Sequence, residues 1–257
     1  MLVIISPAKK LNWDPVSLTD VTSPVFQKEA LELTEIAKNL SPKKLSDLMK
    51  ISSNLAQLNF DRFNSFESEP TKKNSKPAAL AFAGDTYVGL EARTLDQESM
   101  QYAQTHLRIL SGLYGLLRPL DQIQPYRLEM GSRLKTKKGK SLYEFWGDLL
   151  SKELNDHASK VNSKFLVNCA SNEYFNAIDT TVLSLKIVTP VFLENKNGQS
   201  KVISFFAKKA RGAMARFIIE QKVTSPGGLK DFDTGGYKFQ NKESSDGKMM
   251  FARDHSS

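Results

Sequence analysis

The sequence is poor in the residues that most often mark a secreted, membrane-spanning or metal-binding protein. Its single cysteine, Cys169, excludes a disulfide within the chain and favours a reducing compartment. Its three histidines are isolated, and no Cys/His spacing indicates a metal site. No stretch approaches the roughly 18 apolar residues of a membrane helix, and residues 1–7 do not resemble a signal peptide. We therefore expect a cytoplasmic protein without membrane contact, bound metal or cofactor.

Two common phosphate-binding motifs, the Walker A sequence and G-x-G-x-x-G, are also missing. Charge, in contrast, is abundant and unbalanced, because 36 Lys and Arg residues face 28 Asp and Glu residues and give a formal net charge of +8. Such an excess favours polyanionic partners such as nucleic acid or phosphorylated ligands. Residues 195–219 contain no acid at all, so the positive charge is least neutralised there.

The segment 206–217 reads as a helix with one apolar and one cationic face. Gly212 and Ala215 lie in the middle of the cationic face, which predicts a shallow groove over bare backbone that could accept a polyanion or a small phosphate ligand. A solvated helix face is the alternative. The apolar face comprises Phe206, Ala210, Ala213, Met214, Phe217 and Ile218, and the cationic face comprises Lys208, Lys209, Arg211 and Arg216.

Apolar runs and helical spacing alternate along the rest of the chain without an internal repeat. They predict an α/β protein, a single compact domain over residues 1–257 with a mixed sheet flanked by helices. The expected strands are 2–5, 78–82, 164–169, 187–193, 201–206 and 249–252. The expected helices are 24–40, 42–50, 54–66, 95–110 and 141–156, together with the basic segment.

Residues 41–66 resemble a helix-hairpin-helix element, a module that binds a DNA backbone without reading sequence. The usual Gly-hydrophobic-Gly hairpin is missing, and a packed helical hairpin without a ligand is the alternative. The residues expected to contact phosphate here are Lys43, Lys44, Lys50, Ser52 and Ser53.

The glycine-rich block 110–131 contains Arg118 and Arg127, each next to a proline or an aromatic residue that restrains the backbone. These could contact phosphates, or could instead form internal salt bridges with Asp121 and Glu129. The arginines expected to line a cleft are Arg118, Arg127 and, in the acid-free loop 131–140, Arg133.

Polar residues also follow several expected strands, and they would converge if those strands are parallel neighbours. The alternative is that each of them is a separate helix cap or turn former. Ser6 and Lys9 follow the first strand, and Ser171 and Glu173 follow the strand 164–169. An enzyme acting on a nucleotide or nucleic acid is therefore an alternative function, with Glu173 and a lysine as acid–base pair. Its candidate catalytic residues are Lys9, Tyr114, Glu173, Lys208 and Arg211.

Several blocks resemble the bacterial YaaA family of peroxide stress proteins, over essentially the whole chain. They are SPAK at 6–9, SGLYGLLRPLD at 111–121, PYRLEMG at 125–131, FWG at 145–147, ASNEY at 170–174 and AKKARGAMARFI at 207–218. The resemblance implies a cytoplasmic protein that supports resistance to hydrogen peroxide, limits damage from unincorporated iron and binds double-stranded and branched DNA. It also implies an unusual α/β fold with a helix-hairpin-helix element, matched here by 42–63, and a positively charged cleft. It implies no enzymatic activity, and direct iron binding is a third possibility.

Overall fold

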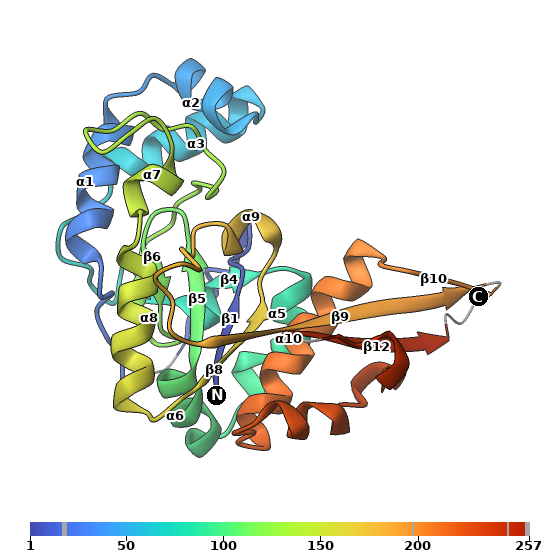
Figure 1. Ribbon diagram of the computed structural model, residues 1–257. Coiled ribbons are helices and arrows are strands. Elements are labelled where there is room, and N and C mark those ends of the chain that lie inside the picture. The colour runs from blue at the N-terminus through green and yellow to red at the C-terminus, as the bar shows by residue number, and fades with distance from the viewer. Residues whose placement is uncertain (17–19, 197, 246, 255–257) are drawn as a thin grey trace.

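Five parallel strands form the centre of the protein in the computed structural model, which describes residues 1–16, 20–196, 198–245 and 247–254 (Figure 1). The sheet order is β11-β12-β9-β8-β1-β5-β6, and β6, β11 and β10 pair antiparallel with β5, β12 and β9. The expected mixed sheet flanked by helices is thus confirmed. Its strands are β1 Leu2–Ile5, β5 Leu107–Ser111, β6 Gly115–Leu117, β8 Phe165–Cys169, β9 Lys186–Lys196, β10 Gln199–Lys201, β11 Lys238–Phe239 and β12 Lys248–Asp254.

The middle of the sheet follows from runs of apolar residues with no polar alternation. All four residues of β1 are fully buried, as is typical of a parallel strand covered on both faces. β1 pairs with β8 so that Ile5 lies opposite Cys169. In the sheet, β5 and β6 lie on one side of β1, whereas β8 and β9, which follow them in the chain, lie on the other side of β1. Such a reversal of strand order opens a crevice beyond the carboxyl ends of the two strands.

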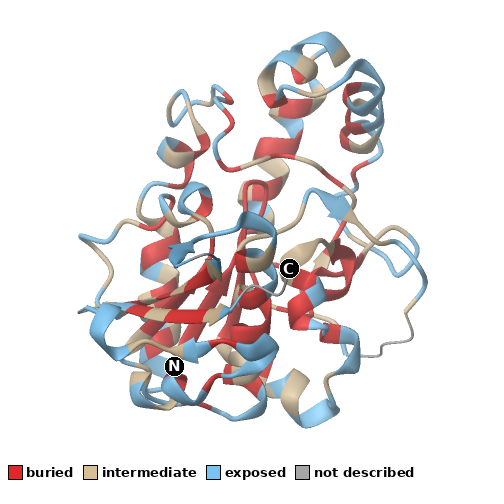
Figure 2. Cartoon of the chain, turned by 90° about the vertical axis from the view of Figure 1, so that its right-hand side faces the viewer, coloured by how far each residue is buried: buried red, intermediate tan, exposed pale blue. Residues whose placement is uncertain are grey.

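Helices cover the sheet and extend beyond its carboxyl-end edge. α10 packs against β1, β8 and β9. In both ribbon views, α2 and α3 lie beyond the end of the sheet, whose central strands are buried (Figures 1 and 2). The helices are α1 Gln27–Lys38, α2 Pro42–Met49, α3 Ser53–Asn64, α4 Ala78–Ala81, α5 Asp85–Leu90, α6 Gln97–His106, α7 Leu142–Trp146, α8 Leu149–Lys160, α9 Asn172–Phe175 and α10 Ser204–Glu220.

The helical pair expected at 42–66 is confirmed as α2 and α3. Ser41 caps α2 through its hydroxyl, with Pro42 at the first helical position, and Ser52 caps α3 in the same way. Lys50 ends α2 in the left-handed conformation, with φ of 52°, where glycine is the usual residue. The tight turn therefore forms without glycine. The Lys50 side chain, however, occupies the position where a glycine would let a DNA phosphate come closer to the backbone.

Three expected elements differ from the structure because tertiary contacts override local pattern. Residues 78–81 form the short buried helix α4, and only Phe82–Ala83, β4, pair with Lys10–Leu11, β2. The helix expected at 95–110 ends at His106, since the apolar residues after it join the buried sheet as β5. The helix expected at 141–156 is broken at Gly147, where φ is 49°. A further short ladder joins β3, Lys76–Pro77, to β7, Gln122–Ile123.

The strand expected at 201–206 is wrong. β10 ends at Lys201, and the apolar residues that suggested a strand are exposed, 53% for Val202 and 55% for Phe205. α10 already begins at Ser204, so Lys208 and Arg211 lie within the helix and not in its first turn. Their position therefore gives no support to an anion site at a helix amino terminus.

The groove expected over Gly212 is filled by helix α5. A Cβ atom on Gly212 would lie 1.8 Å from the carbonyl oxygen of Thr86, and one on Gly89 would lie 2.0 Å from that of Lys209. Each glycine thus lets its helix touch the backbone of the other. Gly212 and Ala215 are buried, so the middle of the supposed cationic face is a helix–helix contact and not a ligand surface.

Candidate functional site

The loops that leave β1 and β8 meet directly at the carboxyl-end edge of the sheet. The Ser171 backbone N–H donates to Ser6 Oγ at 2.9 Å, and the two serine hydroxyls lie 3.3 Å apart. The two strands are parallel neighbours, and Ser6 and Ser171 come together, as the convergent interpretation requires. We call the region around these loops the strand-end crevice, and define it by Ser6, Lys9, Glu129, Ser171 and Glu173.

An ion-pair cluster lies in the strand-end crevice. Glu129 Oε1 lies 3.5 Å from Lys9 Nζ and accepts from Arg127 Nε at 2.9 Å, with Arg127 Nη2 at 2.8 Å. The side chain of Glu129 is only 12% exposed, whereas that of Lys9 is 67% exposed. Glu173 accepts instead from the Gly131 N–H at 3.1 Å. The carboxylate partner of Lys9 is thus Glu129 and not, as expected for the enzyme alternative, Glu173.

Three tyrosines form the buried floor of the crevice. Burial raises the pKa of Tyr87, Tyr126 and Tyr174, and their mutual proximity raises it further in Tyr87. The Tyr87 hydroxyl donates to the Ser6 carbonyl, and the Tyr126 hydroxyl lies 2.6 Å from Ser111 Oγ at the end of β5. All three phenols therefore remain neutral hydrogen-bonding groups at physiological pH.

Helix α10 contributes two of its cations to this edge of the sheet. Lys208 Nζ lies 3.9 Å from a carboxylate oxygen of Asp85, in the turn where Gly84 packs against Ala8. Arg211 is half-buried and makes no hydrogen bond or ion pair with any residue that the structure describes. Burial raises the pKa of Cys169 to about 12, and the nearby Arg211 opposes that rise. Arg211 thus adds unneutralised positive charge at the carboxyl end of β8.

Tyr114, a candidate of the enzyme alternative, is a structural residue. It is 1% exposed, its hydroxyl accepts from the Gln124 backbone N–H, and its ring packs edge-on against Tyr126. Its pKa is raised by burial. A phenol held in this way has no access to a ligand at the surface.

Three of the expected phosphate-binding arginines are already engaged inside the protein. Arg118 binds Asp121, whose side chain is 0% exposed, through Nε and Nη2 at 3.0 and 2.8 Å. With Arg127 bound to Glu129, the salt-bridge alternative for the block 110–131 is correct. Arg216 donates to the carbonyls of Leu90 and Glu91 and so caps α5.

Apart from the half-buried Arg211, the other expected phosphate-binding cations are exposed. Those that form no ion pair within the described part of the chain are Lys43, Lys44, Lys50, Arg133 and Lys209. Ser52 and Ser53 are also exposed, although the Ser52 hydroxyl already accepts from the Leu55 N–H. Arg133 lies two residues after Gly131, whose N–H contacts Glu173 of the strand-end crevice.

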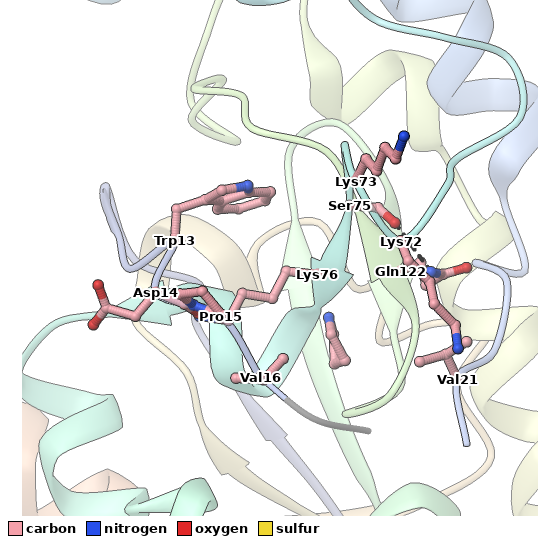
Figure 3. Close-up of a pocket in the computed structure, with 11 residues that line it drawn as sticks. Trp13, Asp14, Pro15, Val16, Val21, Lys72, Lys73, Ser75, Lys76 and Gln122 are labelled. Atoms are coloured by element: carbon pink, nitrogen blue, oxygen red, sulfur yellow. Dashed lines mark hydrogen bonds between the residues drawn. The ribbon is translucent and has the colours of Figure 1, made fainter. Parts of the chain in front are cut away.

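A separate cavity of about 230 Å³ lies beside Trp13 and three lysines (Figure 3). Lys72 and Lys73 point in different directions, and Lys76 reaches toward the segment around Asp14 (Figure 3). Lys76 Nζ donates to the carbonyls of Asn12 and Asp14 at 2.9 and 2.7 Å. Burial lowers its pKa. The lysines do not converge, so this cavity lacks the arrangement expected of an anion site.

Two further properties concern metal and membrane. Within residues 1–16, 20–196, 198–245 and 247–254, no three His, Cys, Asp or Glu side chains are grouped so that they could hold a metal ion. Over the same ranges, no helix combines the length and the apolar character needed to cross a bilayer.

Comparison with known proteins identifies the family. The model of the family described as "Peroxide stress protein YaaA" matches residues 1–243. The chain belongs to the YaaA family of peroxide stress proteins. It is 58% identical over 253 residues to a UPF0246 protein of Jannaschia sp., covering 98% of this chain and 97% of that protein. It is 55% identical to a UPF0246 protein of Dinoroseobacter shibae, covering 98% and 95%. Membership in the YaaA family supports a role in oxidative stress.

Glu129 was the main residue that sequence reasoning did not assign to a site. It was considered only as a partner for an arginine, and that pairing does occur. A signal was nevertheless available, because Arg127 and Glu129 are two residues apart and so point to the same side of an extended segment. What the pattern could not show is that Lys9, more than a hundred residues earlier in the printed sequence, reaches the same carboxylate.

Proposed function

We propose that this protein binds double-stranded or branched DNA in the cytoplasm during peroxide stress, largely without reading sequence. The observation that carries the proposal is the set of exposed cations around the strand-end edge, of which five have no ion-pair partner in the described ranges. Cations that are not neutralised by neighbouring acids remain available to phosphates, and such contacts position DNA without specifying its sequence.

The cations fall into two groups on either side of the edge. Lys208 and Lys209 belong to α10, whereas Lys43, Lys44 and Lys50 belong to α2 and its end (Figure 1). Arg133 follows Gly131, whose N–H contacts Glu173. The carbonyl and carboxylate contacts of Arg118, Arg127 and Arg216 remove those residues from the proposed interface.

The experiment is a titration of a fluorescent duplex and a four-way junction at several salt concentrations. If about five phosphates are neutralised, log K should fall with log salt with a slope of about −4 to −5. Replacing Lys208 and Lys209 by alanine should make the slope less steep by about 2, and replacing Lys43 and Lys44 should do the same.

A matched control replaces Lys160 and Lys164, which are exposed at the opposite edge of the sheet, where β8 begins. This change removes the same positive charge and should leave the slope near its parent value. Salt screens the interaction between the DNA phosphates and exposed lysines that lie far from the interface. A slope near zero, or equal effects of all three double variants, would contradict a defined interface.

A further inference from the structure

We propose that the strand-end crevice is also a binding site for a small organic anion that carries a hydrogen-bond donor next to its anionic group, such as a 2-hydroxy acid. The proposal is independent of DNA binding. It rests on a carboxylate oxygen, a small cavity and an excess of cations that lie together at the place where α/β sheets most often bind ligands.

The carboxylate oxygen is Glu129 Oε2. Lys9 and Arg127 both interact with the other oxygen, Oε1, and Oε2 is buried without a hydrogen-bond partner among the described residues. A buried acceptor left in this state is unfavourable, and a charged one more so than a neutral one. Because Oε2 is closed to water, an O–H or N–H group of a ligand would satisfy it only after a neighbouring side chain, such as the exposed Lys9, moves aside.

The cavity beside Glu129 limits what that donor can be. Its volume is about 20 Å³, and it is lined by residues that include Ala8, Lys9, Tyr126 and Tyr174. This space suits a group about the size of one water molecule. A hydroxyl or amino group therefore fits at the inner end, while the larger anionic part of the ligand remains at the mouth.

Positive charge around the crevice selects the anion. Lys9 and Arg127 share the Glu129 carboxylate, and Arg211, near Cys169 at the end of β8, has no ion-pair partner in the described ranges. With Arg211 counted, the cations at this edge outnumber Glu129 and Glu173. Lys9 is the most exposed of these groups, so its long side chain has room to move from its 3.5 Å contact onto a ligand. A carboxylate two bonds from the donor hydroxyl matches this arrangement.

The test compares glycolate with acetate, two carboxylates that differ by one hydroxyl group, by isothermal titration calorimetry. The parent protein should bind glycolate about tenfold more tightly than acetate, because the additional hydrogen bond is made to a charged and buried acceptor. Glu129→Gln should reduce this ratio to near one, since it places an amide donor opposite the hydroxyl. Lys9→Ala should weaken both probes several-fold and leave their ratio unchanged.

Lys10→Ala is the matched control, since the neighbouring lysine is exposed on β2 and forms no ion pair in the described part of the chain. It should bind both probes like the parent. Thermal melting confirms that each variant is folded. Equal affinities in the parent, as expected if the cavity holds only water, would overturn the proposal. The same conclusion follows if neither probe saturates below 100 mM, or if the ratio survives in folded Glu129→Gln.

Discussion

Gly212→Ala separates two interpretations of the basic helix, because they predict opposite signs for its effect on stability. If Gly212 opened a surface groove, alanine would improve helix propensity and stabilise the protein by about 1 kcal/mol. The structure instead places the new methyl group 1.8 Å from Thr86 O and 2.8 Å from Leu90 N. Both neighbours are backbone atoms of α5, so no rotamer change relieves the overlap.

The magnitude follows from the shift that the overlap requires. To reach ordinary van der Waals distance, α5 and α10 must separate by about 1.5 Å, which also weakens contacts along the rest of the crossing. Overpacking of this kind costs about 3 kcal/mol, and the propensity gain offsets about 1 kcal/mol. We therefore expect a net destabilisation of about 2 kcal/mol, or roughly 4–8 °C in Tm for a chain of this length.

Urea unfolding followed by circular dichroism measures the effect, with Gly227→Ala as the control. A Cβ atom on Gly227 would meet only Ser225 Oγ at 3.8 Å, so this change should alter the free energy of unfolding by less than about 0.5 kcal/mol. An unchanged or increased stability of Gly212→Ala would refute the close crossing of α5 and α10 and restore the open groove.

Three further outcomes follow from buried polar groups. Arg118→Ala should lower the free energy of unfolding by about 3 kcal/mol, measured in urea, because the Asp121 carboxylate loses its cation in a fully buried site. Burial lowers the pKa of His157 to about 4, so the unfolded chain takes up its proton first as pH falls below 6.5. About 1 kcal/mol of stability, discounted for partial exposure, should be lost between pH 6.5 and 4 and retained in His157→Gln. Cys169, buried and with a pKa of about 12, should react with a disulfide reagent at pH 8 only after denaturation.

The predictable parts of the fold are those in which the residue pattern is compatible with only one kind of local structure. The apolar runs at β1 and β8 carry no polar alternation and can be satisfied only inside a sheet. Ser41-Pro42 gave a helix start from capping chemistry alone, and the structure shows that cap. The convergence of Ser6 and Ser171 was only conditional in the sequence, because it required the two strands to be parallel neighbours, as the structure shows them to be.

The wrong predictions concern small or charged residues that could serve either a ligand site or a contact within the protein. Gly212 permits close approach by any backbone, and periodicity within one helix does not reveal that the approaching backbone is α5. Arg216 was similarly ambiguous, because a cation on a helix surface can face solvent or cap the carboxyl end of another helix. The run from 201 to 206 has strand-like composition, but the exposed edge at β10 offers its apolar residues no layer to pack against.

The contact between α5 and α10 also explains why the basic helix still bears on function after its groove is lost. The crossing fixes α5 so that Tyr87 reaches Ser6 and Asp85 faces Lys208, both at the strand-end edge. It leaves Arg211 half-buried near Cys169, at the end of β8, without a carboxylate partner in the described residues. Arg216 stabilises the helix crossing through its hydrogen bond to the Leu90 carbonyl, whereas Arg211 makes no such contact and is only positioned by the crossing. Helix α5 therefore divides the cationic face of α10 into two parts. The charge of Arg216 is used in the contact with α5, whereas the charge of Arg211, nearer the crevice, remains available to an anion.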